Sequence, residues 1–295
     1  MEIKYKASVD LTYDQVIDKI ENFTFPSIKK KVLSMKIREP YYGVWALEGD
    51  KLLGVALADN ATDGVSELFS LFVLPEKRNK GIGRSLINAM ETLLKERGVK
   101  IIQSRYQSNW KSINEINKLI KSGDWKEPVL ARVVAEGEIE NYKNVPWPEI
   151  KISSDYEIFQ WENITPEDKN EIERLQETKE ISHEFNPYQH QDKIYMPASL
   201  GLRHKGKLAG WNIVYLLDKE TAEYNNLFIV KEYRKIGHAI TLLHKAFGRQ
   251  YEENLPKAKW LINGDNIATL KIFKRIAGKH LSKYYEVYLT AKKLN

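Results

Sequence analysis

Cysteine is absent from this 295-residue sequence, and its absence excludes several kinds of chemistry. The protein cannot form a disulfide, use a thiolate nucleophile or bind zinc through cysteine ligands. The 6 histidines all follow residue 182, and none has a partner at a spacing typical of metal ligands. We therefore expect no metal site.

Long hydrophobic runs are also absent. No apolar stretch approaches the length of a membrane span, and the charged start MEIKYK is not followed by the apolar core of a signal peptide. These absences predict a cytoplasmic protein without a membrane partner. The composition, 42% hydrophobic and 29% charged residues, is ordinary for a folded protein, and the length suits about two domains.

The formal net charge of +6 suits an anionic partner, such as a nucleotide-like cofactor or a nucleic acid. Lysine and glutamate are nevertheless interspersed along most of the chain, as on an ordinary solvated surface. The one local basic cluster, Lys29–Arg38, is short. We therefore do not expect a nucleic-acid partner, although the cluster keeps it open as an alternative.

An internal repeat is the most informative feature that the sequence contains. When the sequence is shifted by 156 positions, Lys51–Gly83 aligns with Lys207–Ala239 without a gap. Composition alone would give roughly two identities over such a window. Nine positions are identical: Lys51/Lys207, Leu52/Leu208, Gly54/Gly210, Glu67/Glu223, Leu71/Leu227, Phe72/Phe228, Glu76/Glu232, Arg78/Arg234 and Gly81/Gly237.

The two copies predict the same order of secondary structure. Segments rich in β-branched, aromatic and aliphatic residues predict strands, and apolar residues at helical spacing predict helices. In the first copy the strands are 42–47, 51–57, 65–74 and 99–105, and the helices are 83–98 and 113–120. The second copy has a strand at 156–161, a hairpin at 200–217, and helices at 166–179, 240–251 and 267–276.

A proline-containing segment, Asn141–Pro148, separates the copies. Its Val-Pro-Trp-Pro sequence disfavours helix and predicts an extended linker. We therefore expect two domains, 1–144 and 145–295, with the boundary near Val145. The mixture of strands and helices gives an α/β (α+β) fold class.

A glycine-containing loop, Arg78–Gly83, lies between an apolar strand and an amphipathic helix. At this position, successive backbone N–H groups and the helix N-terminus can converge on an anion such as a pyrophosphate. Glycine allows the phosphate to approach the backbone, and Arg78, Lys80 and Arg84 add positive charge.

This segment resembles the acetyl-CoA signature of the GNAT superfamily of N-acetyltransferases. In that signature a strand, Val-x-Pro and Arg-x-x-Gly-x-Gly precede a helix. Here it is Val73-Leu74-Pro75 followed by Arg78–Gly83. Dinucleotide-binding folds are disfavoured, because their glycine fingerprint has a different spacing and lies at a first βα turn.

The resemblance implies two tandem GNAT folds, each a mixed, mostly antiparallel twisted sheet flanked by helices. It also implies an N-acetyltransferase that moves an acetyl group from acetyl-CoA directly to a primary amine. Without cysteine, the transfer cannot pass through a cysteine thioester on the enzyme. The cofactor-binding residues that it implies in the first copy are Phe72, Val73, Arg78, Asn79, Lys80, Gly81, Ile82, Gly83 and Arg84.

The second copy matches the signature less well. Its loop, Arg234–Ala239, resembles the family's Arg-x-x-Gly-x-Ala form, but Lys231 replaces the proline and Ile236 is apolar. We therefore expect the first copy to be the better catalyst and the second to bind cofactor weakly or not at all. Its implied cofactor-binding residues are Phe228, Ile229, Arg234, Lys235, Gly237, Ala239 and Asn266.

Two glutamates are the candidate catalytic bases. Family members sometimes use a glutamate on the strand before the loop to deprotonate the amine through water. Glu67 lies 11 residues before Arg78, and Glu223 lies 11 before Arg234. Strict alternation along the strand places Glu67 on one face with Phe69, Leu71 and Val73. Apolar neighbours there would raise the pKa of its carboxylate toward the working range of a base. The alternative is that both glutamates end their strands at the solvent edge.

The family's usual proton donor is missing from both copies. Many members protonate the departing thiolate of CoA with a tyrosine on the helix after the following strand. Phe273 stands at that position in the second copy, and Leu119 stands there in the first. Tyr106 and Tyr233 are available elsewhere, and each also suits a structural role.

The missing tyrosine favours one alternative function, a non-catalytic acyl-CoA-binding module or pseudoenzyme with a regulatory role. For the enzyme, we expect the acceptor to be an amine of a small molecule or peptide. We expect the protein to be a monomer or a homodimer.

Overall fold

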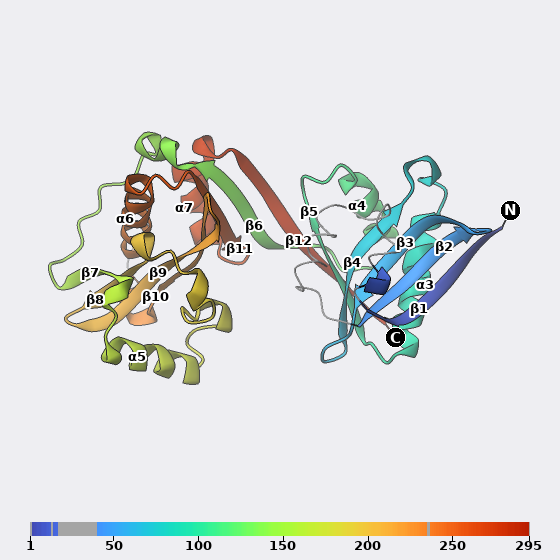
Figure 1. Cartoon of the computed structure of the whole chain (residues 1–295), viewed down its shortest axis with the longest axis horizontal. Coiled ribbons are helices and arrows are strands. Elements are labelled where there is room, and N and C mark those ends of the chain that lie inside the picture. Colours follow the sequence, from blue (N-terminus) through green and yellow to red (C-terminus); the bar gives the residue numbers. More distant parts are fainter. Residues whose placement is uncertain (1, 13, 17–39, 235–236, 295) are drawn as a thin grey trace. The chain divides into compact units, whose positions relative to one another are not determined.

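The computed structural model describes residues 2–12, 14–16, 40–234 and 237–294, which form two compact units (Figure 1). Unit 1 consists of Met1–Ala131 and Val287–Asn295, and unit 2 consists of Arg132–Glu286. Among the helices that the structure describes, none is long and apolar enough to span a membrane. The basic cluster Lys29–Arg38 lies outside the described residues.

Unit 1 contains a mixed sheet with helices α3 (Ile82–Glu96) and α4 (Ile113–Ser122). Successive strands pair antiparallel from β1 (Ile3–Leu11) to β4, whereas β4 and β5 are parallel. The sheet strands are β2 (Tyr41–Glu48), β3 (Lys51–Asp59), β4 (Val65–Val73) and β5 (Ile101–Gln107). The last strand, β12 (Lys283–Lys293), pairs antiparallel with β5 from Val287 onward.

Unit 2 repeats this arrangement with helices α5 (Pro166–Glu177), α6 (His238–Glu252) and α7 (Ile267–Ala277). Its strands are β6 (Val129–Glu138), β7 (Tyr156–Gln160), β8 (Leu200–His204), β9 (Lys207–Asp218), β10 (Thr221–Ile229) and β11 (Lys257–Asn263). Strands β7 to β10 pair antiparallel in sequence order, β10 and β11 are parallel, and β11 pairs antiparallel with β6.

The predicted repeat is present in three dimensions. Strand β10, helix α6 and strand β11 begin and end 156 residues after β4, α3 and β5 respectively. The predicted fold class, two GNAT-like units with mixed and mostly antiparallel sheets, is therefore confirmed.

Amphipathic helices cover one face of the sheet in each unit. In α3, Leu86, Met90 and Leu94 recur every four residues and are fully buried against the strands. Burying such a side chain contributes about 1.5–3 kcal/mol, which fixes α3, and with it the loop that precedes it, on the sheet. A separate cluster that includes Trp161 and Trp211 forms the core of unit 2.

The final strands of the two copies are exchanged between the units. Strand β6 ends the first copy but pairs with β11 of the second, while β12 ends the second copy and pairs with β5 of the first. The contacts therefore divide the chain after Ala131 and again after Glu286, rather than once near Val145. The strands predicted from the sequence do not include β1, β6, β11 or β12, because charged residues interrupt their apolar patterns.

Proline substitutions at Lys292 and Ala135 form a matched test of this exchange. Proline removes a ladder hydrogen bond from a strand. Lys292 pairs with Ile102, and its N–H points toward β5 as that of Leu294 does, so Lys292→Pro should lower hydrogen-exchange protection in β5 and leave β11 protected. Ala135 pairs with Trp260, so Ala135→Pro should do the reverse. Loss of protection in β5 on Ala135→Pro would contradict the exchange.

Candidate active site

A β-bulge lies at the same place in the fourth strand of each copy. On β4, Leu68 pairs with Ala58 and Ser70 pairs with Leu57, so Phe69 is an extra residue. On β10, Tyr224 and Asn226 flank the equivalent irregularity. Bulges re-aim the side chains of a strand and are common beside active sites.

The bulge overturns the prediction that Glu67, Phe69, Leu71 and Val73 share one face. Leu71 and Val73 pack with α3, whereas Phe69 packs in a different cluster on the opposite side of the sheet. One inserted residue reverses the alternation, because side chains on a strand point to opposite faces with a period of two.

Strands β4 and β5 separate just before the bulge. Their parallel pairing covers only Val65 to Glu67, which pairs with Gln103. At the point of separation, the hydroxyl of Ser104 donates a hydrogen bond of 2.9 Å to the carbonyl of Leu68. The part of β4 that follows is therefore open to a ligand on its β5 side.

The backbone of Leu71 points into this opening. Leu74 donates its N–H to the carbonyl of Leu53 on β3, at 2.9 Å. N–H groups alternate in direction along a strand, so those of Val73 and Leu71 point away from β3. They are placed to donate hydrogen bonds to a molecule bound between β4 and β5.

A cleft of about 970 Å³ occupies this opening and continues to the glycine loop. Its charged lining is strongly basic, with Glu115 as the one acid among the described residues that line it. The cationic side chains are Lys77, Arg78, Arg84, Arg105, Lys111 and Lys118. Such a lining favours a polyanionic ligand of roughly nucleotide size.

The glycine loop presents free N–H groups at the N-terminus of α3. Gly81 caps the helix with φ 81°, and Asn79 has φ 60°, so both adopt the left-handed conformation. Within the described residues, the protein accepts no hydrogen bond from the N–H groups of residues 79–83. A Cβ atom placed on Gly81 would meet nothing within 4 Å. The loop therefore presents a helix N-terminus with unpaired N–H groups and open space, which is the geometry that an anion-binding site requires.

Arg78 is oriented differently from the expected phosphate ligand. Its Nε donates to the carbonyl of Val73 at 3.0 Å, and its guanidinium lies 5.8 Å from the ring centre of Phe72. Arg234 makes the equivalent contacts with Ile229, at 2.9 Å, and Phe228, at 5.6 Å. In both copies this arginine holds the end of the strand against the loop.

Ser70 adds a polar group to the wall of the cleft. It is only 4% exposed, and its hydroxyl has no hydrogen-bond partner in the part of the chain that the structure describes. A buried unsatisfied hydroxyl is costly, so its place beside the open edge of β4 fits a ligand that carries polar groups. Together with the glycine loop and the basic lining, it fits the amides and phosphates of coenzyme A.

Both candidate glutamates form ion pairs with the neighbouring strand. Glu67 binds the guanidinium of Arg105 on β5, and Glu223 lies 3.2 Å from the ammonium of Lys259 on β11. Glu223 also accepts a hydrogen bond of 2.9 Å from Asn225. The apolar surroundings expected for Glu67 are thus replaced by a cation that sequence analysis did not identify, because it comes from a different strand.

Of the two available tyrosines, Tyr106 is the one that lines the cleft. It is 4% exposed, and its hydroxyl lies 3.4 Å from Oδ1 of Asn117 on α4. Burial, assisted by the charge of Glu127, raises the pKa of the Tyr106 phenol above its usual value. Leu119, at the position of the family tyrosine, is an apolar part of the same lining. Tyr233 packs in the core of unit 2.

The expected cofactor residues of the second copy are less accessible. Phe228 and Ile229 are buried at 7% and 8% exposure, and Asn266 uses its side chain to cap α7 by accepting from Thr269. Lys235 lies outside the described residues. Gly237 is buried, whereas its counterpart Gly81 is exposed. The structure thus opens the first loop and covers the second.

The comparisons with known proteins agree with this geometry. Residues 13–114 match the model of the acetyltransferase (GNAT) family. A tandem GNAT protein from the clavulanic acid biosynthesis pathway is 15% identical with a TM-score of 0.60, covering 100% of this chain and 99% of that one. A GCN5-related N-acetyltransferase from Sphaerobacter thermophilus is 13% identical with a TM-score of 0.63, covering 99% and 96%. The comparison with curated proteins gives no match.

The fold and the family match indicate an acyltransferase of the GNAT type. More particularly, residues 13–114 match the GNAT acetyltransferase family, and the whole chain has the tandem form of the GNAT fold.

Gly81→Glu tests the anion-binding role of the loop. The new side chain has room, but its carboxylate would stand where a phosphate should bind and would repel it. We expect the affinity for coenzyme A to fall about 100-fold or more, measured by calorimetry. Gly98→Glu is the matched control, because Gly98 also has a positive φ and open space at its Cβ but follows α3. Equal affinities in the two variants would refute the assignment.

Proposed function

We propose that this protein transfers an acetyl group from acetyl-CoA to a primary amine, and that unit 1 carries out the reaction. The observation that carries the proposal is the continuity of one basic cleft from the glycine loop to the opening between β4 and β5. A long ligand with phosphates at one end and a reactive group at the other suits such a cleft.

The residues of unit 1 supply three functions for this reaction. The N–H groups at the start of α3 bind the diphosphate, and the cationic lining adds attraction. The N–H of Leu71 polarises the carbonyl of the bound acetyl group and stabilises the negative charge that develops on its oxygen. Acetyl-CoA itself supplies an activated thioester.

The reaction also requires two proton transfers, one from the amine and one to the departing thiolate. The nitrogen of the amine forms a bond to the carbonyl carbon as the carbon–sulfur bond breaks. Glu67 removes the proton of the amine through water, and Arg105 holds its carboxylate in place. Tyr106 gives its proton to the departing thiolate, a role that its raised pKa supports by keeping the phenol protonated.

The acceptor in this proposal is an amine on a small molecule or a peptide. The alternative function, a non-catalytic acyl-CoA-binding module, differs in one measurable respect. It predicts binding of acetyl-CoA without release of free CoA in the presence of any amine from a broad panel. Amine-dependent release of CoA by the purified protein would therefore support the enzyme, and its absence would support the module.

Glu67→Gln and Glu223→Gln test which unit carries out the chemistry. Both glutamates are paired with a cation at equivalent positions, so the two substitutions disturb their surroundings similarly. If Glu67 acts as the base, its loss should lower kcat by about 100-fold, with little change in the KM for acetyl-CoA. Glu223→Gln should cost far less. A larger loss of kcat from Glu223→Gln would assign the chemistry to unit 2.

Tyr106→Phe tests the proton donor. We expect kcat to fall by about 10-fold to 100-fold, while the KM for acetyl-CoA and the melting temperature stay close to their normal values. Because the pKa of Tyr106 is raised, the wild-type phenol should keep its proton up to pH values above that of ordinary tyrosine. An unchanged kcat in Tyr106→Phe would contradict this role.

A further inference from the structure

Unit 2 contains the counterpart of the unit 1 cleft, but it is almost filled. The remaining space is about 120 Å³, against about 970 Å³ in unit 1. Eight of its lining residues lie 156 positions after residues that line the cleft of unit 1. The pairs are Leu71/Leu227, Gly83/Ala239, Arg84/Ile240, Ile87/Leu243, Ser104/Trp260, Ile116/Ile272, Ile120/Ile276 and Trp125/Leu281.

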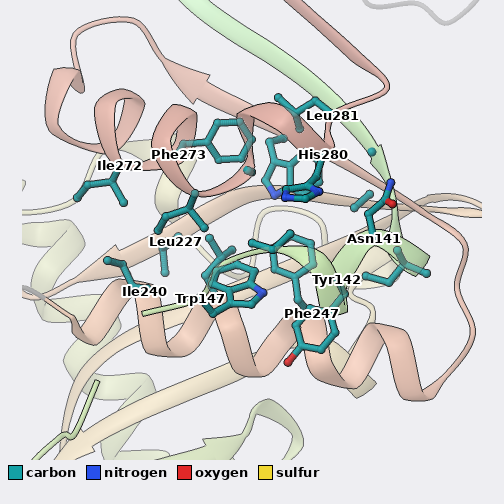
Figure 2. Close-up of a pocket in the computed structure, with 18 of the residues that line it drawn as sticks. Asn141, Tyr142, Trp147, Leu227, Ile240, Phe247, Ile272, Phe273, His280 and Leu281 are labelled. Carbon is teal, nitrogen blue, oxygen red and sulfur yellow. The ribbon is translucent and has the colours of Figure 1, made fainter. Parts of the chain in front are cut away.

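Side chains of the linker between the two copies fill this space. Tyr142, Val145 and Trp147 line the remaining cavity together with residues of α6 and α7. Figure 2 shows Trp147 beside Leu227 and Ile240, on the α6 side of the cavity and across from Phe273 of α7. The segment predicted as an extended connection is therefore packed into the cleft of unit 2.

Trp147 is held there by aromatic contacts. Its ring stacks on His244 of α6 with centroids 4.9 Å apart and an interplanar angle of 12°, and it lies 5.5 Å from Phe247. Burial lowers the pKa of His244, so this imidazole is neutral near pH 7 and packs as an uncharged ring. Tyr142 adds a second ring 6.2 Å from Trp147.

Ile150, two residues after this linker, covers the glycine loop of unit 2. A Cβ atom on Gly237 would lie 2.6 Å from Cγ2 of Ile150, whereas one on Gly81 would meet nothing within 4 Å. Ile150 therefore lies on the glycine at the place where a phosphate would approach the backbone in unit 1. The linker and Ile150 together cover the apolar part of the cleft and the glycine loop at its other end.

The two clefts also differ in charge: the lining is basic in unit 1 and apolar in unit 2. Among the residues that the structure describes, the lining of the unit 2 cavity includes no lysine or arginine, and its one carboxylate is Glu138. Ile240 takes the place of Arg84, and Trp260 takes the place of Ser104. An apolar lining favours an apolar occupant such as Trp147 over a polyanion.

We propose that residues 142–150 occupy the coenzyme cleft of unit 2 in place of a coenzyme, so that each chain binds one acetyl-CoA, in unit 1. The inference rests on the proposed function for the identity of the ligand, but the position of the linker does not depend on it. Unit 2 is then a structural partner whose cleft is filled by its own chain.

Stoichiometry tests the first part. Titration of the purified chain with acetyl-CoA should give one site, and Gly81→Glu should remove it. Two sites in the wild type, or one remaining in Gly81→Glu, would overturn the proposal, because either result requires binding in unit 2.

Single cysteines test the position of the linker directly, since the chain has none of its own. Ile150→Cys should react with a maleimide about tenfold more slowly than Lys151→Cys, its exposed neighbour, because only the first thiol is shielded by Gly237. Saturating acetyl-CoA should not change either rate. Equal rates, or acceleration of Ile150→Cys by acetyl-CoA, would overturn the proposal.

The two experiments separate this inference from the proposed function. If the wild type binds no acetyl-CoA while Ile150→Cys remains shielded, the proposed function fails and the position of the linker is supported.

Discussion

The separation of β4 from β5 is the feature on which the rest of the site depends. Two parallel strands would normally pair along their whole length, because each unpaired backbone group loses a hydrogen bond. Here the pairing stops at Glu67, just before the bulge at Phe69. The N–H groups of Leu71 and Val73 are thereby released from the sheet and become available to a ligand.

The glycine loop acts at the other end of the same cleft. Helix α3 is fixed on the sheet by its buried apolar face, so its first N–H groups have a defined position relative to β4. Gly81 keeps the approach to them clear. Arg78, folded back on Val73 and Phe72, joins the strand to the loop and so maintains the distance between the two ends of the cleft.

The two copies show how one architecture supports different outcomes. They share the bulge, the arginine contacts, the glutamate with its cation and the exchanged last strand. The two clefts differ in their lining and in what fills them. The cleft of unit 1 has a basic lining and is open, whereas the cleft of unit 2 has an aromatic lining and is filled by the linker. The fold therefore persists in unit 2 although its cleft is filled, since Trp147 and its neighbours pack where unit 1 is open.

The sequence by itself determined the repeat, many of the strands and helices, the glycine loop and the better match of the first copy to the cofactor signature. These features depend on local patterns: hydrophobic period, glycine at a helix start and residue identity at a fixed shift. Only the tertiary structure decided which strands pair, that Phe69 reverses the alternation, that Arg105 pairs with Glu67 and that Trp147 fills the second cleft. Each of these depends on contacts between residues far apart in the chain, which no local pattern specifies.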